Sequence, residues 1–245
     1  MDAEEIDYGI VPRRKGAGMF VPNDQLIELM NDYPNHFFTL AALDLAEGMD
    51  VIFNEIDKFV VNGPCCDVSL EPGAPMGNHP GRFVDDLILW PIYKKCEKNN
   101  VTVTFTHSGP AYPDLTGTMP HRIQNIIKEF PKLNIALMHS AWPWAAAITG
   151  LAFAYTNIFI IPDIYMIHGP DWRDYVDAAN YIAQDNICYG SAYPLASLKN
   201  AISYYKSAGI REEVLPKVMG LNAVRAFNLK IDGVEANKVE DTPFM

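Results

Sequence analysis

Short apolar segments and amphipathic segments alternate along almost the whole chain, and this alternation limits the possible folds. Seven segments are rich in Val, Ile, Phe and Thr, as buried strands are. They lie at residues 8–11, 37–43, 66–70, 101–106, 134–138, 158–161 and 187–189. Between them, apolar residues such as Leu26, Ile27 and Met30 recur at helical spacing. This pattern, uninterrupted by a linker, predicts one α/β domain on a parallel sheet, either doubly wound or closed into a barrel.

Residues 133–162 carry no formal charge and are numerous enough to cross a bilayer. His139, Pro143, Gly150 and Pro162 interrupt this stretch at short intervals. They divide it into an expected strand, a helix from about residue 144 to 154, and a second strand. A strand–helix–strand unit inside a parallel sheet is apolar on nearly every face, so we expect a buried unit and not a membrane span.

Composition and charge limit the classes of molecule that this 245-residue chain can bind. Hydrophobic residues make up 49%, which suffices for a large core. A formal net charge of −11 disfavours binding to nucleic acid and to anionic membranes. The four cysteines show no C-x-x-C spacing, and the acidic N-terminus is unlike an export signal. We therefore expect a cytoplasmic protein with a small-molecule substrate, no nucleic-acid partner and no membrane partner.

Ionisable residues follow six of the seven predicted strands, at the point where each strand ends. In chain order the residues at the seven ends are Arg13, Asp44, Glu71, His107, His139, Asp163 and Ala192. In parallel α/β folds the carboxyl ends of the strands carry the functional groups. A single histidine there is more often structural, but two histidines with several carboxylates are costly to bury together. They predict a catalytic site.

Several of these segments resemble the amidohydrolase-related (amidohydrolase 2) group of TIM barrels. The matching segments are 1–10, 70–73, 90–93, the two histidine segments around 107 and 139, 189–194 and 222–227. The resemblance implies a TIM-type (β/α) barrel over residues 1–231 and a C-terminal tail at 232–245. It also implies a metal-dependent hydrolase or a non-oxidative decarboxylase, similar to aminocarboxymuconate-semialdehyde decarboxylase.

The resemblance also implies roles for individual residues. His107 matches a ligand of a divalent metal, zinc or manganese, and His139 matches the catalytic acid or base. Apart from the resemblance, Asp163 and Glu71 are candidates to bind a metal or to orient a histidine. The first strand of the family supplies two more ligands in an H-x-H or E-x-H motif, and this chain begins after that strand. Ala192 stands where the family usually has a metal-binding aspartate. We therefore expect a barrel lacking its first strand and a metal site that is incomplete within this chain.

Further candidates would contact the substrate. They are Arg13, Glu71, His79, Trp142, Tyr165, His168 and Tyr193. Arg13 could pair with a substrate carboxylate, and the aromatic residues could line a pocket for a planar ligand. Each also has a plainer interpretation, as an exposed loop residue, a helix cap or a core aromatic.

Two hypotheses about function follow. The first is an enzyme that hydrolyses or decarboxylates a small carboxylated, aromatic substrate, with His139 transferring protons. The second is a metal-free subunit on the same scaffold that binds a small molecule or has a structural role. The histidines favour the first, and Ala192 favours the second.

Either the chain is a fragment, or it is a seven-strand variant whose open edge is covered, for example by another subunit. We expect a homo-oligomer, because unpaired edges invite association.

Overall fold

The computed structural model describes residues 1–12, 15–16, 19–74, 81–112, 114–167 and 169–236, with only the backbone described at 15–16 and 19–20. Within these residues, six parallel strands form one sheet in the order β1-β4-β5-β6-β7-β8. Their bounds are β1 (Gly9–Pro12), β4 (Phe37–Ala42), β5 (Asp67–Leu70), β6 (Val103–Thr106), β7 (Ile135–Met138) and β8 (Ile158–Ile161). A short antiparallel pair, β2 (Lys15–Gly16) and β3 (Met19–Phe20), follows β1.

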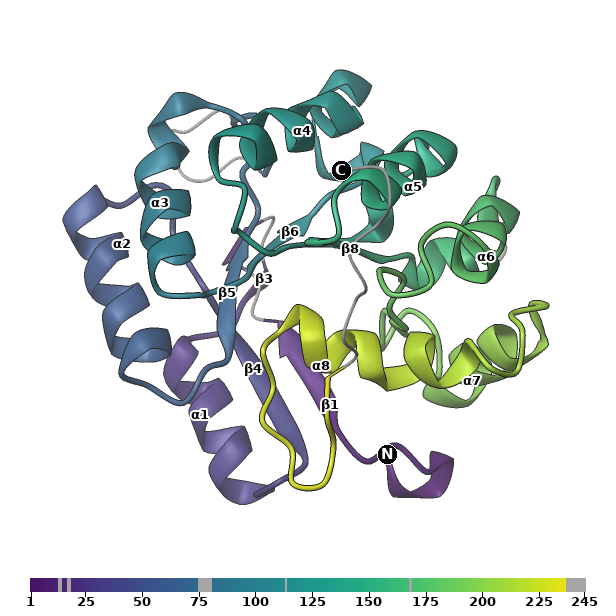
Figure 1. The fold of residues 1–245 in the computed structure, drawn as a ribbon. Helices are drawn as coiled ribbons and strands as arrows, with labels where there is room; N and C mark the ends of the chain where they lie inside the picture. Colours follow the sequence, from purple (N-terminus) through teal and green to yellow (C-terminus); the bar gives the residue numbers. More distant parts are fainter. Residues whose placement is uncertain (13–14, 17–18, 75–80, 113, 168, 237–245) are drawn as a thin grey trace.

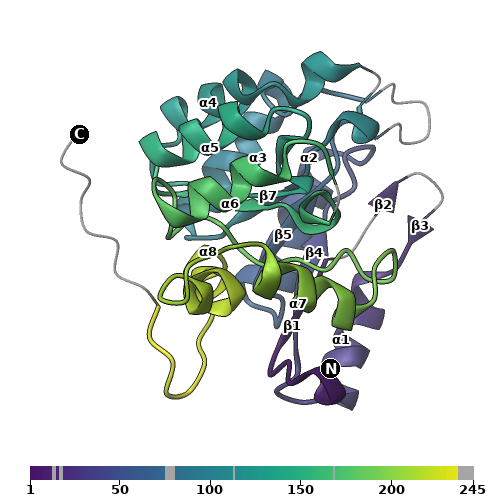
Figure 2. The same ribbon diagram turned by 90° about the vertical axis from the view of Figure 1, so that its right-hand side faces the viewer.

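The helices form an arc around the outside of this sheet (Figure 1). They are α1 (Asn23–Asp32), α2 (Met49–Glu55) with its π-helical extension Ile56–Val61, α3 (Trp90–Lys98), α4 (Pro120–Glu129), α5 (Ala145–Ala154), α6 (Trp172–Asn180) and α7 (Leu198–Ser207). The last helix, α8 (Asn222–Ala226), lies at the start of the strands. Figure 2 shows α4, α5 and α6 side by side along one flank. The predicted TIM-type barrel is therefore confirmed, in the form of a partial barrel that is open between its first and last strands.

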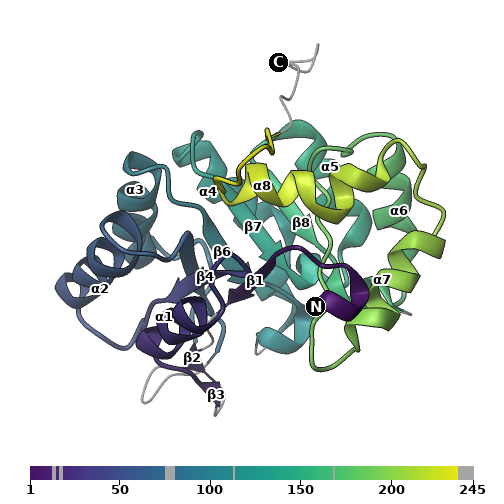
Figure 3. The same cartoon turned by 90° about the horizontal axis from the view of Figure 1, so that it is seen from below.

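The last predicted strand, at 187–189, is reduced to a single bridge in which Ile187 pairs with Ile160 of β8. Cys188 still donates its N–H to the Ile160 carbonyl, but Tyr189 donates to the carbonyl of Val218. This segment therefore pairs with β8 only at Ile187 and Cys188, and its backbone turns away from β8 at Tyr189. At the other edge, the N-terminal residues run from β1 toward α7 (Figure 3).

The uncharged stretch forms β7, α5 and β8, as predicted. Both strands pair in parallel, and β8 is buried throughout. Ala145, Ile148 and Ala152 of α5 are also buried. Among the described residues, no helix combines the length and apolar composition needed to cross a membrane.

Two apolar clusters hold the sheet on its two faces. The larger fills the space between the sheet and the surrounding helices, and the smaller includes Leu40, Phe159 and Phe227. α8 is fixed at the start of the strands, where Thr102 donates to the Ala226 carbonyl at 2.6 Å. Arg225 donates to the carbonyls of Thr156 and Asp185. Because α8 lies at this end, the side chains that follow the strands gather at the opposite edge, where the His139 imidazole is partly exposed.

Candidate active site

His139 follows β7 and begins a left-handed turn. The φ angles of His139, Ser140 and Ala141 are 66°, 50° and 56°. Side chains with a Cβ rarely adopt this region, at a cost of about 1–2 kcal/mol per residue. Such a turn persists only when neighbouring groups hold it.

Backbone hydrogen bonds join this turn to the loop after β6. The N–H of Ala141 donates to the His107 carbonyl at 2.7 Å, and the N–H of His107 donates to the Met138 carbonyl at 2.9 Å. Gly109 donates to the Trp142 carbonyl at 2.8 Å. The two histidine segments predicted from sequence therefore form one connected edge of the barrel.

Asp163, which follows β8, binds His139 through both carboxylate oxygens. Oδ1 lies 2.8 Å from Nδ1 of the imidazole, and Oδ2 accepts the backbone N–H of His139 at 2.9 Å. The carboxylate side chain is only 6% exposed, whereas the imidazole is 23% exposed. A carboxylate at Nδ1 holds the proton on that nitrogen and leaves Nε2 to exchange protons with a ligand. The structure thus brings the two predicted catalytic residues into contact, and their catalytic role stays a prediction.

His107 is completely buried at the end of β6. Its Nδ1 lies 3.2 Å from the Tyr112 hydroxyl, and its Nε2 has no hydrogen-bond partner among the described residues. Burial lowers the pKa of His107 to about 3, although the neighbouring backbone of Thr118 acts in the opposite direction. The imidazole is therefore neutral at pH 7, the form in which histidine can coordinate a metal.

Tyr112 is a site residue that the sequence analysis did not identify. Its ring meets the His107 ring edge-on, with centroids 5.4 Å apart. Glycine lies on both sides of it, because a Cβ on Gly73 or Gly117 would come within 2.4 or 2.5 Å of the tyrosine ring. The sequence held no signal for this residue, because only the tertiary fold brings Gly73 to Tyr112.

The other predicted carboxylate of the site, Glu71, follows β5 and is 7% exposed. Its Oε1 accepts the Thr106 hydroxyl at 2.8 Å. This bond links the end of β5 to the residue before His107. Glu71 thus lies at the same edge of the barrel as the two histidines, next to the more buried one.

Two of the predicted aromatic residues form a wall beside His139. Trp142 and Tyr165 stack with ring centroids 4.9 Å apart and planes 9° apart, and we call this pair the aromatic wall. Tyr165 also meets the His139 ring edge-on at 5.8 Å. The indole N–H of Trp142 donates to the Pro170 carbonyl at 3.3 Å. Tyr193 lies on a different segment and is 68% exposed.

Three of the predicted substrate contacts, Arg13, His79 and His168, lie outside the described residues. Ala192 is half-buried with φ 52°. In the described part of the chain, no group of three His, Cys, Asp or Glu side chains is arranged to hold a metal ion. Because a catalytic zinc site normally has three protein ligands, these residues by themselves do not fit a metal site.

Two further tyrosines, Tyr175 and Tyr205, support the strand-end loops and were also missed. The Tyr175 hydroxyl donates to the Ser140 carbonyl at 3.2 Å, and the Tyr205 hydroxyl accepts the Gly190 N–H at 3.4 Å. Both side chains are fully buried on α6 and α7. Sequence periodicity identifies such residues only as core.

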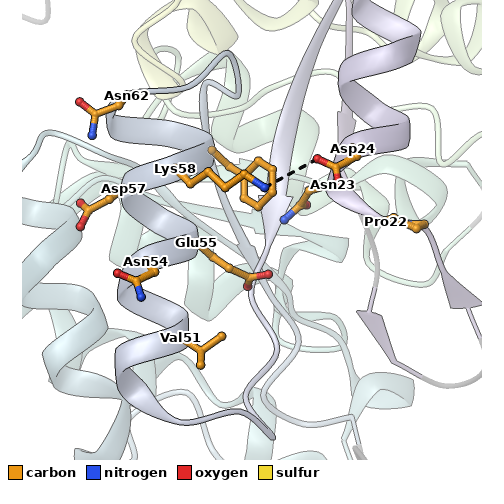
Figure 4. A pocket seen from close by; sticks show the side chains of 10 residues that line it. Pro22, Asn23, Asp24, Val51, Asn54, Glu55, Asp57, Lys58 and Asn62 are labelled. Atoms are coloured by element: carbon orange, nitrogen blue, oxygen red, sulfur yellow. Dashed lines mark ion pairs between the residues drawn. The ribbon is translucent and has the colours of Figure 1, made fainter.

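A hollow of about 720 Å³ lies away from this edge, on the outer side of the sheet. Figure 4 shows it between α1, with Asn23 and Asp24, and α2 with its extension, where Lys58 lies 4.0 Å from Asp24. It is lined by none of the predicted site residues. The strand-end cluster, and not this hollow, carries the groups suited to chemistry.

Comparison with known proteins supports the fold and its class. The sequence profile of a family described as amidohydrolase matches residues 12–229. An uncharacterized TIM-barrel protein from Bordetella bronchiseptica is 28% identical, with a TM-score of 0.86, and the match covers 93% of this chain and 80% of that one. No curated protein matches the sequence significantly.

Two decarboxylases of known structure share the fold at lower identity. The 2,6-dihydroxybenzoate decarboxylase from Rhizobium is 18% identical, with a TM-score of 0.76, over 93% of this chain and 86% of that one. A dihydroxybenzoic acid decarboxylase from Polaromonas, solved with manganese and the inhibitor 2-nitroresorcinol, is 15% identical, with a TM-score of 0.68, over 84% and 73%. At these identities, the similarity shows the fold alone.

Proposed function

This chain belongs to the amidohydrolase family, and from this premise we propose that it is an enzyme that removes CO₂ from a small aromatic carboxylic acid. The observation that carries the proposal is the His139–Asp163 pair beside the aromatic wall. The fold shared with two aromatic-acid decarboxylases supports the choice of reaction.

The proposed reaction needs a proton donor next to a planar ring. The bond between the ring carbon and the carboxylate breaks, its electron pair stays on the ring carbon, and that carbon takes up a proton. Nε2 of a protonated His139 supplies the proton, while Asp163 keeps the Nδ1 proton in place and stabilises the imidazolium. Water then returns a proton to the neutral imidazole, and the hydroxide that remains combines with the released CO₂ to give bicarbonate.

The aromatic wall suits a planar substrate. An aromatic ring that packs against such side chains gains about 0.5–1.5 kcal/mol beyond the burial of its area. Tyr165 contacts both the His139 ring and Trp142. A ring bound against this wall would therefore lie near the imidazole that protonates it.

A metal ion could stabilise charge on the substrate, as the manganese in the Polaromonas enzyme suggests. In this chain His107 would be one ligand. The described residues do not complete a set of three, so the proposed proton transfer rests on His139 and Asp163 alone. Acid–base catalysis by a positioned side chain contributes about 10²–10⁴-fold in rate.

The experiment is a screen of hydroxybenzoates and related aromatic acids, with CO₂ release and the decarboxylated ring both measured. We expect His139→Gln and Asp163→Asn to reduce kcat by about 10²-fold or more. His36→Gln is the matched control, because the His36 side chain is exposed and its Nδ1 lies 3.1 Å from the Pro34 carbonyl, in a turn before β4. Hydrolysis of an ester or amide without CO₂ release would refute decarboxylation and favour the hydrolase alternative.

A second candidate function is ligand binding without catalysis. It is favoured by Ala192, whose methyl group supplies no metal ligand, and by the incomplete donor set. Calorimetric binding of an aromatic acid with no turnover, unaffected by His139→Gln, would support this alternative over the enzyme.

A further inference from the structure

Tyr175 lies on α6, behind the turn that carries His139. Its side chain is fully buried, and its hydroxyl donates to the backbone carbonyl of Ser140 at 3.2 Å. α6 packs on α5 and on the residues that follow β8. The tyrosine therefore reaches the turn from the helix layer, through the Ser140 carbonyl.

Each residue of the left-handed turn is held by a different group. His139 is bound through its backbone N–H and its ring by Asp163, and Ala141 is bound through its N–H by the His107 carbonyl. For Ser140, the middle residue, the described hydrogen bond is the one from Tyr175. The Ser140 hydroxyl itself is buried without a hydrogen-bond partner among the described residues.

We propose that Tyr175 is a positioning residue that fixes the Ser140 carbonyl and thereby keeps the His139 ring aligned with Asp163. Because three left-handed residues together cost several kcal/mol, the turn will relax when a restraint is removed. A rotation at Ser140 moves the adjacent residue, His139, whose ring must stay within hydrogen-bond reach of the carboxylate.

The Tyr175 hydroxyl is a permanent donor. Burial raises its pKa well above the ordinary value, and the nearby charges of Asp163, Asp171 and Asp174 raise it further. It therefore stays protonated at neutral pH. The expected effect of Tyr175 on kcat rests on the proposed function. The effect of Tyr175 on the alignment of the His139 ring does not.

Tyr93 provides a matched control. It is also fully buried on a helix, α3, and its hydroxyl donates to a backbone carbonyl, that of Val84, at 2.5 Å. Tyr93→Phe and Tyr175→Phe therefore remove the same kind of hydrogen bond. Only Tyr175 contacts the turn that carries His139.

The experiment follows the Nδ1 proton of His139 by NMR, with the resonance assigned by its loss in His139→Gln. We expect this proton to exchange with solvent at least about 10-fold faster in Tyr175→Phe than in the wild type, because its hydrogen bond to Asp163 opens more often. In Tyr93→Phe the exchange rate should stay within about 2-fold of the wild type. With an active substrate, Tyr175→Phe should lower kcat and leave KM nearly unchanged.

Unchanged exchange in a folded Tyr175→Phe protein would overturn the inference and leave Tyr175 a packing residue. If exchange is faster in Tyr175→Phe than in the wild type, but the wild type decarboxylates no aromatic acid, the positioning role is supported while the proposed function is refuted. If Tyr175→Phe fails to fold, the comparison is made in a Ser140→Gly background. There, faster exchange than in Ser140→Gly alone supports the inference, and equal exchange overturns it.

Discussion

Replacement of Ser140 by glycine is expected to raise the free energy of unfolding by about 2 kcal/mol, although it removes a buried side chain. Ser140 has φ 50° and is fully buried, and its hydroxyl has no partner among the described residues. Glycine adopts this backbone conformation freely, which relieves about 1–2 kcal/mol. Loss of an unsatisfied buried hydroxyl relieves about 1–3 kcal/mol more.

The opposing effect is the greater freedom of glycine in the unfolded chain, which costs about 0.5–1 kcal/mol. The balance is therefore stabilising across the whole range of these values. For a chain of this length, a gain of about 2 kcal/mol corresponds to a rise in Tm of about 4–8 °C.

Urea denaturation followed by circular dichroism measures the effect. Ser140→Ala is the comparison, because it removes the hydroxyl but keeps the Cβ in the left-handed conformation. We expect Ser140→Ala to stabilise the protein less than Ser140→Gly does. If Ser140→Gly unfolds at lower urea concentration than the wild type, the turn is not strained in the way that its φ angles indicate.

Three other substitutions or conditions test the surroundings of the site. Gly73→Ala would place a Cβ 2.4 Å from the Tyr112 ring, so we expect a loss of about 1–3 kcal/mol in urea denaturation. Gly190→Ala would place one 3.0 Å from the Asp163 Cβ, and we expect kcat to fall as His139 loses alignment. As the pH falls from about 6.5 toward 3, unfolded His107 binds a proton that the folded state excludes, so stability should fall by about 1.4 kcal/mol per pH unit from this group. In His107→Gln, denaturation curves measured over the same pH range should show a shallower dependence.

The main elements, and the proximity of residues that follow neighbouring strands, could be predicted from sequence. The runs at β7 and β8 are apolar throughout because both faces of these strands are buried. A polar residue directly after such a run marks the edge of the sheet. This is why His139 and Asp163, 24 residues apart in the chain, could be expected to lie close together.

The groups that hold these side chains could not be predicted in the same way. Tyr112, Tyr175 and Tyr205 act through single hydroxyl groups. Periodic apolar spacing predicts the helix that forms α7, and a tyrosine on the inner face of such a helix looks like any other core residue. The partner of its hydroxyl is a backbone atom whose position depends on the tertiary fold and not on local sequence.

The distribution of left-handed residues supports the proposed role of the His139 edge. Ordinary turns of this chain use asparagine in that conformation, as at Asn35, Asn100 and Asn228, and asparagine tolerates it well. The ends of β7 and β8 instead place His139, Ser140, Ala141 and Asp163 there. Neither the serine nor the alanine is suited to the conformation, so folding alone gives no reason for the choice. Strain of this kind is typical of positions where the geometry of a functional group is kept at the expense of stability. In this chain the strained backbone carries His139, whose imidazole is partly exposed. The fully buried His107 has no such left-handed backbone.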